Sequence, residues 1–255
     1  MTAGYRSTRS AHVLRVLLVL LSASTAHSQA APVTDARAVL ARYAEVTNAA
    51  KYATIPGFRI KGTVDLPAAG LSGTMEQFAD QAGRVVQVVT FTGIGEMKEG
   101  VDTAFAWSLN LIEGPKLIEG KEFVEKRERE DPLAARRDPA IVLDAQTLGD
   151  TALDGDACVK IRLTWKSGRQ TTECYSRKTG LLLYIDGVES SSMGQIASTT
   201  TLSDYKTFEG ITVPTKSVQR AVGTEITVRV TEVVFGAVDP AKLAVPPEIL
   251  ALRRK

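Results

Sequence analysis

The sequence predicts a mainly β protein in which a curved antiparallel sheet forms an incomplete barrel, with covering helices. Three observations lead to this prediction. Apolar and polar residues alternate at a period of two through most of the chain after residue 57. Turn dipeptides such as Asp154-Gly155 and Thr179-Gly180 separate successive segments, giving roughly ten strands. Helical periodicity is confined to an early segment and a middle segment of the chain.

The first 28 residues are expected to be a secretory signal peptide. Arg6, Arg9 and Arg15 give a positively charged start, residues 16–21 form a short apolar run, and small residues follow. The apolar run is too short to span a membrane. No cysteine follows the cleavage region, so a lipid-anchored protein is not expected. We therefore expect residues 29–255 to be a single exported, periplasmic domain without a transmembrane anchor.

The composition of the processed chain excludes several classes of function. The whole chain has 31 Lys and Arg against 29 Asp and Glu, and removal of the three leader arginines leaves 28 against 29. With no basic excess, nucleic acid is not an expected partner. Both histidines, His12 and His27, leave with the leader. The mature protein therefore lacks the commonest general base and the commonest transition-metal ligand.

The early segment, residues 34–49, is predicted to be an amphipathic helix. Thr34 is the expected N-cap, and one face of the helix carries Val39, Leu40, Tyr43 and Val46. The middle segment, residues 119–132, has oppositely charged residues at i, i+4 spacing. This pattern favours a solvated helical face over a catalytic carboxylate pair. A mobile lid, held only by Phe123 and Val124, is the alternative for this second helix.

Two predicted strands indicate where an apolar ligand would bind. Residues 58–66 alternate, with Phe58, Ile60, Val64 and Leu66 on one side. The strand at 84–93 is apolar on both sides, with Val86 and Val88 on one face and Val85, Val89 and Phe91 on the other. A strand of this kind needs cover on both faces of its sheet. The early helix covers one face, so a lid, a partner or a bound apolar ligand must cover the other.

A serine-enzyme motif is present by spacing alone. Ser203 and Lys206 match S-x-x-K, and Lys178-Thr179-Gly180 matches K-T-G. In acyl-serine enzymes the first motif begins a helix, whereas residues 199–208 are β-formers without a capping signal. The order of the two motifs is also reversed, and S-D-N is missing. We interpret the match as coincidence and predict no catalytic residue.

Other candidate sites lack essential parts. Residues 70–74 fall one residue short of a nucleophile elbow, and no histidine follows to complete a triad. Asp150, Asp154 and Asp156 lack the loop spacing and the distal glutamate of a calcium site. We predict no metal and no cofactor, and we do not expect an enzyme.

The two cysteines, Cys158 and Cys174, flank a hairpin that is predicted to turn at Ser167-Gly168. With that two-residue turn, paired positions sum to 335, and the cysteines point to opposite faces of the sheet. A disulfide would require a β-bulge, although an oxidising compartment permits one. We favour two unpaired thiols, with Cys174 buried among Ile161, Leu163 and Trp165.

Several hairpins together resemble the outer-membrane lipoprotein-sorting superfamily, which includes LolA, LolB, LppX and the sensor domain of RseB. The matching segments are residues 58–66, 95–110, 153–163, 176–188 and 202–219. The last segment resembles the recurring Tyr-Lys…Gly…Pro hairpin of the family through Tyr205, Lys206, Gly210 and Pro214. The resemblance extends over residues 35–250 and includes no catalytic signature.

The resemblance implies a half-barrel with helices over its concave side and an apolar hollow that takes lipids or lipoprotein acyl chains. The expected function is binding of such an apolar ligand, and the alternative is a non-catalytic sensor or interaction module that docks an envelope protein on the same sheet. For any single side chain, an ordinary core role is the simpler interpretation. The predicted ligand contacts are Ile60, Val64, Met75, Val86, Val88, Phe105, Trp107 and Leu109.

Overall fold

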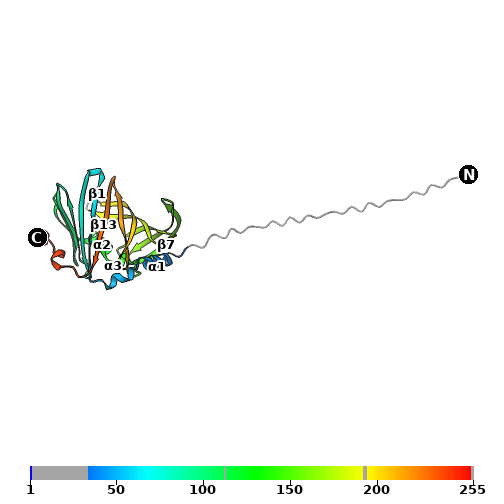
Figure 1. Ribbon diagram of the computed structural model, residues 1–255, viewed down its shortest axis with the longest axis horizontal. Coiled ribbons are helices and arrows are strands. Elements are labelled where there is room, and N and C mark those ends of the chain that lie inside the picture. The colour runs from blue at the N-terminus through cyan, green and yellow to red at the C-terminus, as the bar shows by residue number, and fades with distance from the viewer. Residues whose placement is uncertain (2–33, 112, 192–193, 254–255) are drawn as a thin grey trace. The chain divides into compact units, whose positions relative to one another are not determined.

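The computed structural model describes Met1 and residues 34–253, except residues 112, 192 and 193, so the predicted signal peptide lies outside the described residues. From residue 34 onward the chain folds around one antiparallel sheet of thirteen strands that curves without closing (Figure 1). This confirms the predicted fold class. The strands are β1 (Gly57–Leu66), β2 (Leu71–Asp80), β3 (Val85–Phe91), β4 (Gly95–Val101), β5 (Ala106–Asn110), β6 (Gly114–Ile118), β7 (Val142–Leu153), β8 (Asp156–Trp165), β9 (Gln170–Ser176), β10 (Leu182–Ser191), β11 (Gly194–Phe208), β12 (Ile211–Ala221) and β13 (Thr224–Phe235).

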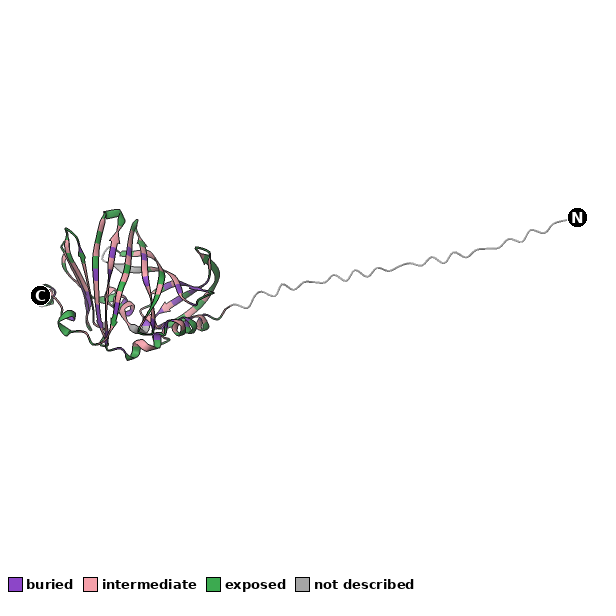
Figure 2. Cartoon of the chain, in the orientation of Figure 1, coloured by how far each residue is buried: buried purple, intermediate pink, exposed green. Residues whose placement is uncertain are grey.

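The order of the strands follows the chain except at one place. The sheet runs β6-β5-β4-β3-β2-β1-β13-β12-β11-β10-β9-β8-β7, so the pairing of β1 with β13 joins two runs of hairpins. The predicted Asp154-Gly155 turn is present, because Leu153 pairs with Asp156. Both turn residues have positive φ, 48° and 85°, which a two-residue hairpin turn of this type requires. Exposed residues gather at the hairpin tips (Figure 2).

Helix α1 (Ala36–Thr47) packs across the concave side of β8, β9 and β10. Its N-cap is Asp35, whose side chain accepts a hydrogen bond from the Arg37 N–H at 3.0 Å, so the prediction of Thr34 as the cap is wrong by one residue. The face predicted from the sequence is the buried one. It places Leu40 and Tyr43 in a core cluster with Ile161, Leu163, Trp165 and Tyr175 of the sheet.

Helix α2 (Gly120–Glu130) lies between the two arms of the curved sheet. It contacts β4 and β5 on one arm and β10 on the other, with α3 (Pro132–Ala135) following it. The prediction of a solvated charged helix is wrong in part, because Glu125 and Glu128 are buried. Phe123 packs against the sheet as expected, whereas Val124 is exposed.

The C-terminal segment covers the outer face of the sheet. It comprises η3 (Pro240–Leu243) and α4 (Pro247–Leu252), which contact β2, β3 and β6. Leu243 and Ile249 are buried against Phe78, Val86 and Trp107. In Figure 1 this segment, in red, lies outside the curve of the sheet. The C-terminal segment therefore packs on a face of the sheet.

The prediction of two unpaired thiols is wrong, because Cys158 and Cys174 form a disulfide with an S–S distance of 2.05 Å. The hairpin between β8 and β9 turns through Lys166, Ser167 and Gly168, as Trp165 and Arg169 pair across it. The extra residue makes paired positions sum to 334, so that Lys160 lies opposite Cys174. Both cysteines then share one face of the sheet, and their Cα atoms stand 5.6 Å apart.

The stretch with the serine-enzyme spacing lies in the sheet. Ser203 and Lys206 are both in β11, where they pair with Lys216 and Val213 of β12, and both are exposed. Phe208 pairs with Ile211 across a Glu209-Gly210 turn. The strand predicted from the β-forming residues around Ser203 is thus confirmed.

Candidate functional site

Contacts of α2 with the sheet identify which residues face the hollow. Lys126 Nζ lies 2.8 Å from Glu99 Oε2, and Gln77 Nε2 donates a hydrogen bond to Glu130 Oε2 at 3.4 Å. Residues that pair directly across antiparallel strands share a face. The pairing runs from Glu99 to Gln87, then to Gln77 and Ile60. Ile60 therefore faces the hollow, as do the residues two and four positions along its strand.

The hollow has an apolar side that we call the apolar wall. Its centre is a buried cluster of Val64, Met75 and Phe91 from β1, β2 and β3. Seven partly buried residues surround this centre on the same side of the sheet: Ile60, Leu66, Leu71, Val89, Met97, Ile226 and Val228. Three predicted contact residues, Ile60, Val64 and Met75, thus lie in the hollow.

The other five predicted contact residues lie elsewhere. Val86, Phe105 and Trp107 are buried in a cluster with the C-terminal segment, and Val88 and Leu109 pack against that cluster. Alternation along β3 gives the reason, since Val86 and Val88 point away from Val85 and Val89. The prediction that all eight residues line the hollow is therefore corrected: these five belong to the outer core.

A cavity of about 340 Å³ adjoins the apolar wall, and we call it the central cavity. It lies between α2 and the inner faces of strands from both arms of the sheet. Ile226 belongs both to this cavity and to the apolar wall. The lining is mixed, with Ile118 and Ile196 beside the charged Lys116, Glu122 and Lys126.

A second cavity of about 270 Å³ lies further along the sheet, and we call it the arginine cavity. It shares Arg129 and Ser198 with the central cavity, so the two are neighbours. Its lining also includes two further arginines, Arg137 and Arg169, and the ring of Trp165. The wall and the two cavities thus form a series through shared residues.

Known structures resemble this sheet in spite of low sequence identity. A DUF1329 family protein from Desulfovibrio piger matches with a TM-score of 0.56 at 13% identity, covering 83% of this chain and 98% of that one. A LolA superfamily protein from Nitrosomonas europaea gives 0.55 at 10% identity, with coverage of 83% and 98%. The chain has a LolA-like fold. A domain described as an outer membrane lipoprotein-sorting protein, from Vibrio parahaemolyticus, gives 0.51 at 10% identity, with coverage of 82% and 97%.

The likeness rests on structure and not on sequence. No protein-family model matches the chain, and no curated protein sequence is significantly similar to it. At identities of 10–13% the neighbours establish the fold alone.

A buried ion pair borders the arginine cavity of the LolA-like hollow. Arg137 donates to both carboxylate oxygens of Glu173, at 2.9 and 3.1 Å, and the Tyr175 hydroxyl also donates to Glu173. Burial is the largest influence on Arg137 and disfavours its charge, but Glu173, Tyr175 and Tyr43 together outweigh burial, and the pKa of Arg137 is raised well above its usual value. Burial first, and the Glu173 charge second, raise the pKa of Tyr175.

Sequence reasoning missed this ion pair and the cavity beside it. Glu173 lies in a strand of threonines, cysteine and tyrosine. A lone acid at an inward position of such a strand indicates a buried charge that needs a partner. Its partner Arg137 lies in the loop after α3, with a positive φ of 53° that no sequence pattern indicates. Arg137 and Glu173 come within hydrogen-bonding distance only in the folded, curved sheet.

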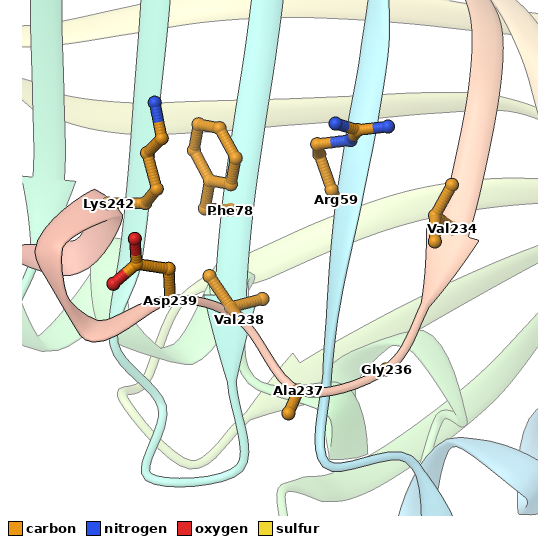
Figure 3. Close-up of a pocket in the computed structure, with 8 residues that line it drawn as sticks. All are labelled: Arg59, Phe78, Val234, Gly236, Ala237, Val238, Asp239 and Lys242. Carbon is orange, nitrogen blue, oxygen red and sulfur yellow. The ribbon is translucent and has the colours of Figure 1, made fainter.

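A further pocket, of about 330 Å³, lies outside the LolA-like hollow (Figure 3). It is the crease where the chain leaves β13 and crosses the outer face through Gly236, Ala237 and Val238. Phe78 is one of its lining residues, and Lys242 Nζ lies 5.6 Å from the centre of that ring. Because the crease is formed by the C-terminal segment on the convex side, we assign it to packing.

Metal and membrane-spanning features are not found in the part of the chain that the structure describes. Within it, no group of three or more His, Cys, Asp and Glu side chains is placed to hold a metal ion. Its helices also fall short of the length and apolar character needed to span a membrane.

Proposed function

We propose that this protein is exported to the periplasm and binds the apolar part of a lipid, such as a lipoprotein acyl chain, against the apolar wall. The observation that carries the proposal is the partial exposure of seven apolar side chains around Val64, Met75 and Phe91 on the concave side of the sheet. Apolar surface of this kind, gathered in one place and rimmed by polar groups, is typical of a binding site.

Burial of apolar surface would supply the binding energy. Each methylene that leaves water for the wall contributes about 0.8 kcal/mol, so even a medium-length chain gains several kcal/mol before the cost of ordering. Ile226 extends the wall into the central cavity. A chain lying on the wall would therefore continue into the central cavity, which lies between α2 and the sheet.

Two further observations support the proposal. The predicted leader sequence indicates export. Two of the similar folds are described as a LolA superfamily protein and as an outer membrane lipoprotein-sorting protein. On these grounds we propose a binding protein and not an enzyme.

A fluorescent fatty acid tests this proposal directly. The test variant is Ile226→Glu, which places a charge where the wall and the central cavity meet. The matched control is Val234→Glu in the same strand, because Val234 is 42% exposed and lines the outer crease. Both variants add one negative charge to β13, on opposite faces of the sheet.

We expect the wild-type protein and Val234→Glu to bind the probe with similar affinity. Ile226→Glu should bind at least about tenfold more weakly, since a carboxylate at the wall must be desolvated by an apolar chain. Equal binding by Ile226→Glu and wild type would place the ligand elsewhere. If wild-type protein binds neither this probe nor extracted lipids, the hollow is not a lipid site, and a docked envelope protein becomes the better hypothesis.

A further inference from the structure

The arginine cavity is rich in positive charge for an interior site. Its lining includes three guanidinium groups, those of Arg129, Arg137 and Arg169, against a single carboxylate, Glu173. The carboxylate is engaged by Arg137 through two hydrogen bonds. Guanidinium groups gathered in a buried place are typical of carboxylate and phosphate recognition, because their fork of donors matches two oxygens.

Arg169 provides the second observation. Its side chain is only 9% exposed, and its Nε is a buried donor without a hydrogen-bond acceptor among the described residues. The nearest carboxylate, Glu128, accepts hydrogen bonds from the backbone N–H and hydroxyl of Ser167, both at 2.8 Å, and its Oε1 stays 3.6 Å from Arg169 Nε. A buried donor of this kind is costly unless an ordered water or a ligand supplies the acceptor.

The charge balance around Arg169 agrees with this interpretation. Burial lowers the pKa of Arg169, and the positive charge of Arg129 lowers it further. Arg169 and Arg137 both lie over the ring of Trp165, 4.7 and 5.5 Å from its centre. The ring is itself held by a hydrogen bond from Trp165 Nε1 to Thr171 Oγ1 at 2.9 Å. The cationic side of the cavity is thus held in place before any ligand arrives.

The arginine cavity is close to the apolar wall. Thr200, which lines the cavity, pairs with Gln219 of β12, and Gln219 pairs with Ile226 of β13. The three residues share the concave face. Two steps between neighbouring strands amount to about 10 Å. The near edge of the arginine cavity is therefore about 10 Å from the wall. Arg129 lines both this cavity and the central cavity, which contains Ile226 of the wall. An amphiphile with its head at the arginines can thus extend its chain through the central cavity towards the wall.

We propose that the arginine cavity binds the anionic headgroup, a carboxylate or a phosphate, of an amphiphile whose chain lies on the apolar wall. This inference rests on the proposed function and adds the class of ligand. It also assigns Arg169 as the main specificity-determining residue of the hollow. The protein would then select ligands by the charge of the headgroup as well as by the fit of the chain to the hollow.

Decanoate and decanol form the test pair, because they share a chain and differ in the charge of the head. The protein has two tryptophans, Trp107 and Trp165. A Trp107→Phe background leaves Trp165, which lines the cavity, as the only reporter. Its fluorescence is followed during titration with each amphiphile, and with acetate and inorganic phosphate as anions that have no chain.

We expect the background protein to bind decanoate about tenfold or more tightly than decanol, the ratio that one charge-assisted hydrogen bond provides. Arg169→Gln should bring the two affinities within about twofold, without changing the affinity for decanol. Arg169→Lys should restore part of the preference. Arg162→Gln is the control, since Arg162 is an exposed residue of β8, and it should keep the full preference.

Each remaining outcome is decisive. Equal binding of decanoate and decanol by the background protein overturns the headgroup site and leaves the proposed function standing. Failure of both amphiphiles to bind refutes both proposals. Acetate or phosphate binding as tightly as decanoate would show a site for free anions instead. If thermal melting shows that Arg169→Gln does not fold, Arg129→Gln must reduce the preference, or the proposal is wrong.

Discussion

Trp107 of β5 lies directly across Gly100 of β4, and its indole occupies the space that a side chain at position 100 would need. A Cβ atom on Gly100 would stand 2.6 Å from both Cε2 and Cζ2 of the ring. Trp107 is at the same time almost completely buried beneath the C-terminal segment. The position of the Trp107 ring therefore requires glycine at position 100, and this close contact holds the ring in the outer core.

Gly100→Ala should destabilise the protein by about 1–3 kcal/mol, because a rigid ring in a packed core has little room to move. Urea unfolding provides the measurement. Gly187→Ala in β10 is the control, since its Cβ would meet only Thr171 Cγ2 at 3.5 Å, an ordinary contact. A cost for Gly100→Ala no larger than that for Gly187→Ala would contradict the packing described.

The C-terminal segment should contribute strongly to stability through one residue. Ile249 of α4 is completely buried among outer-core residues, whereas its neighbour Leu250 is 39% exposed. We expect Ile249→Ala to cost about 2–4 kcal/mol and Leu250→Ala less than about 1 kcal/mol. The same unfolding experiment compares them. Similar costs for the two would mean that α4 does not dock on the sheet in this way.

The disulfide predicts the behaviour of the thiols. Protein unfolded without reductant should show no reactive thiol, and reduction should release those of Cys158 and Cys174. The bond closes a loop with a sequence separation of 16, so its loss should lower the free energy of unfolding by about 3 kcal/mol. The Cys158→Ser, Cys174→Ser double variant should be insensitive to reductant. Two free thiols in the untreated protein would refute the pairing.

Buried tyrosines should make the fold sensitive to alkali. Burial, with a smaller contribution from Tyr43, raises the pKa of Tyr52 to about 12. Above pH ~10 an unfolded tyrosine loses its proton while folded Tyr52 keeps it. The unfolded state then binds fewer protons, so this part of the stability is complete below pH ~10 and is lost as the pH rises towards 12.

Urea unfolding at a series of pH values between 8 and 12 measures this effect. The free energy of unfolding of Tyr52→Phe should fall less steeply with pH than that of the wild type. The difference should be at most about 2 kcal/mol over the range. Tyr43, Tyr175 and Tyr205 also have a raised pKa, chiefly because of burial, so the variant should keep part of the slope. A stability that does not change with pH in this range would show that these hydroxyls are hydrated.

The sequence predicted the strands well but not the faces of the sheet. Alternation in β3 shows two apolar faces, and it correctly indicates that each needs cover. It does not show which face is concave, since curvature arises from the twist and pairing of all the strands. Val86, Trp107 and their neighbours were therefore predicted in the hollow, whereas the C-terminal segment covers them on the outer side.

Register errors have a similar origin. Asp154-Gly155 was placed correctly because two residues of positive φ specify a two-residue turn. Ser167-Gly168 suggested the same turn, but Lys166 is also part of the loop, and one extra residue reversed the predicted faces of the cysteines. Arg137 lies more than thirty residues before Arg169 and Glu173, which belong to β9 and its preceding turn, so its proximity to them could not be predicted from local pattern.

Native mass spectrometry of the protein, purified from the cell envelope without detergent, tests the central proposal most directly. The masses of wild type and Ile226→Glu are compared, and bound lipid is extracted and identified from each. We predict an additional lipid mass on wild-type protein that is absent or much reduced in Ile226→Glu. Wild-type protein that carries only its own polypeptide mass, and yields no lipid on extraction, would contradict a lipid-binding hollow.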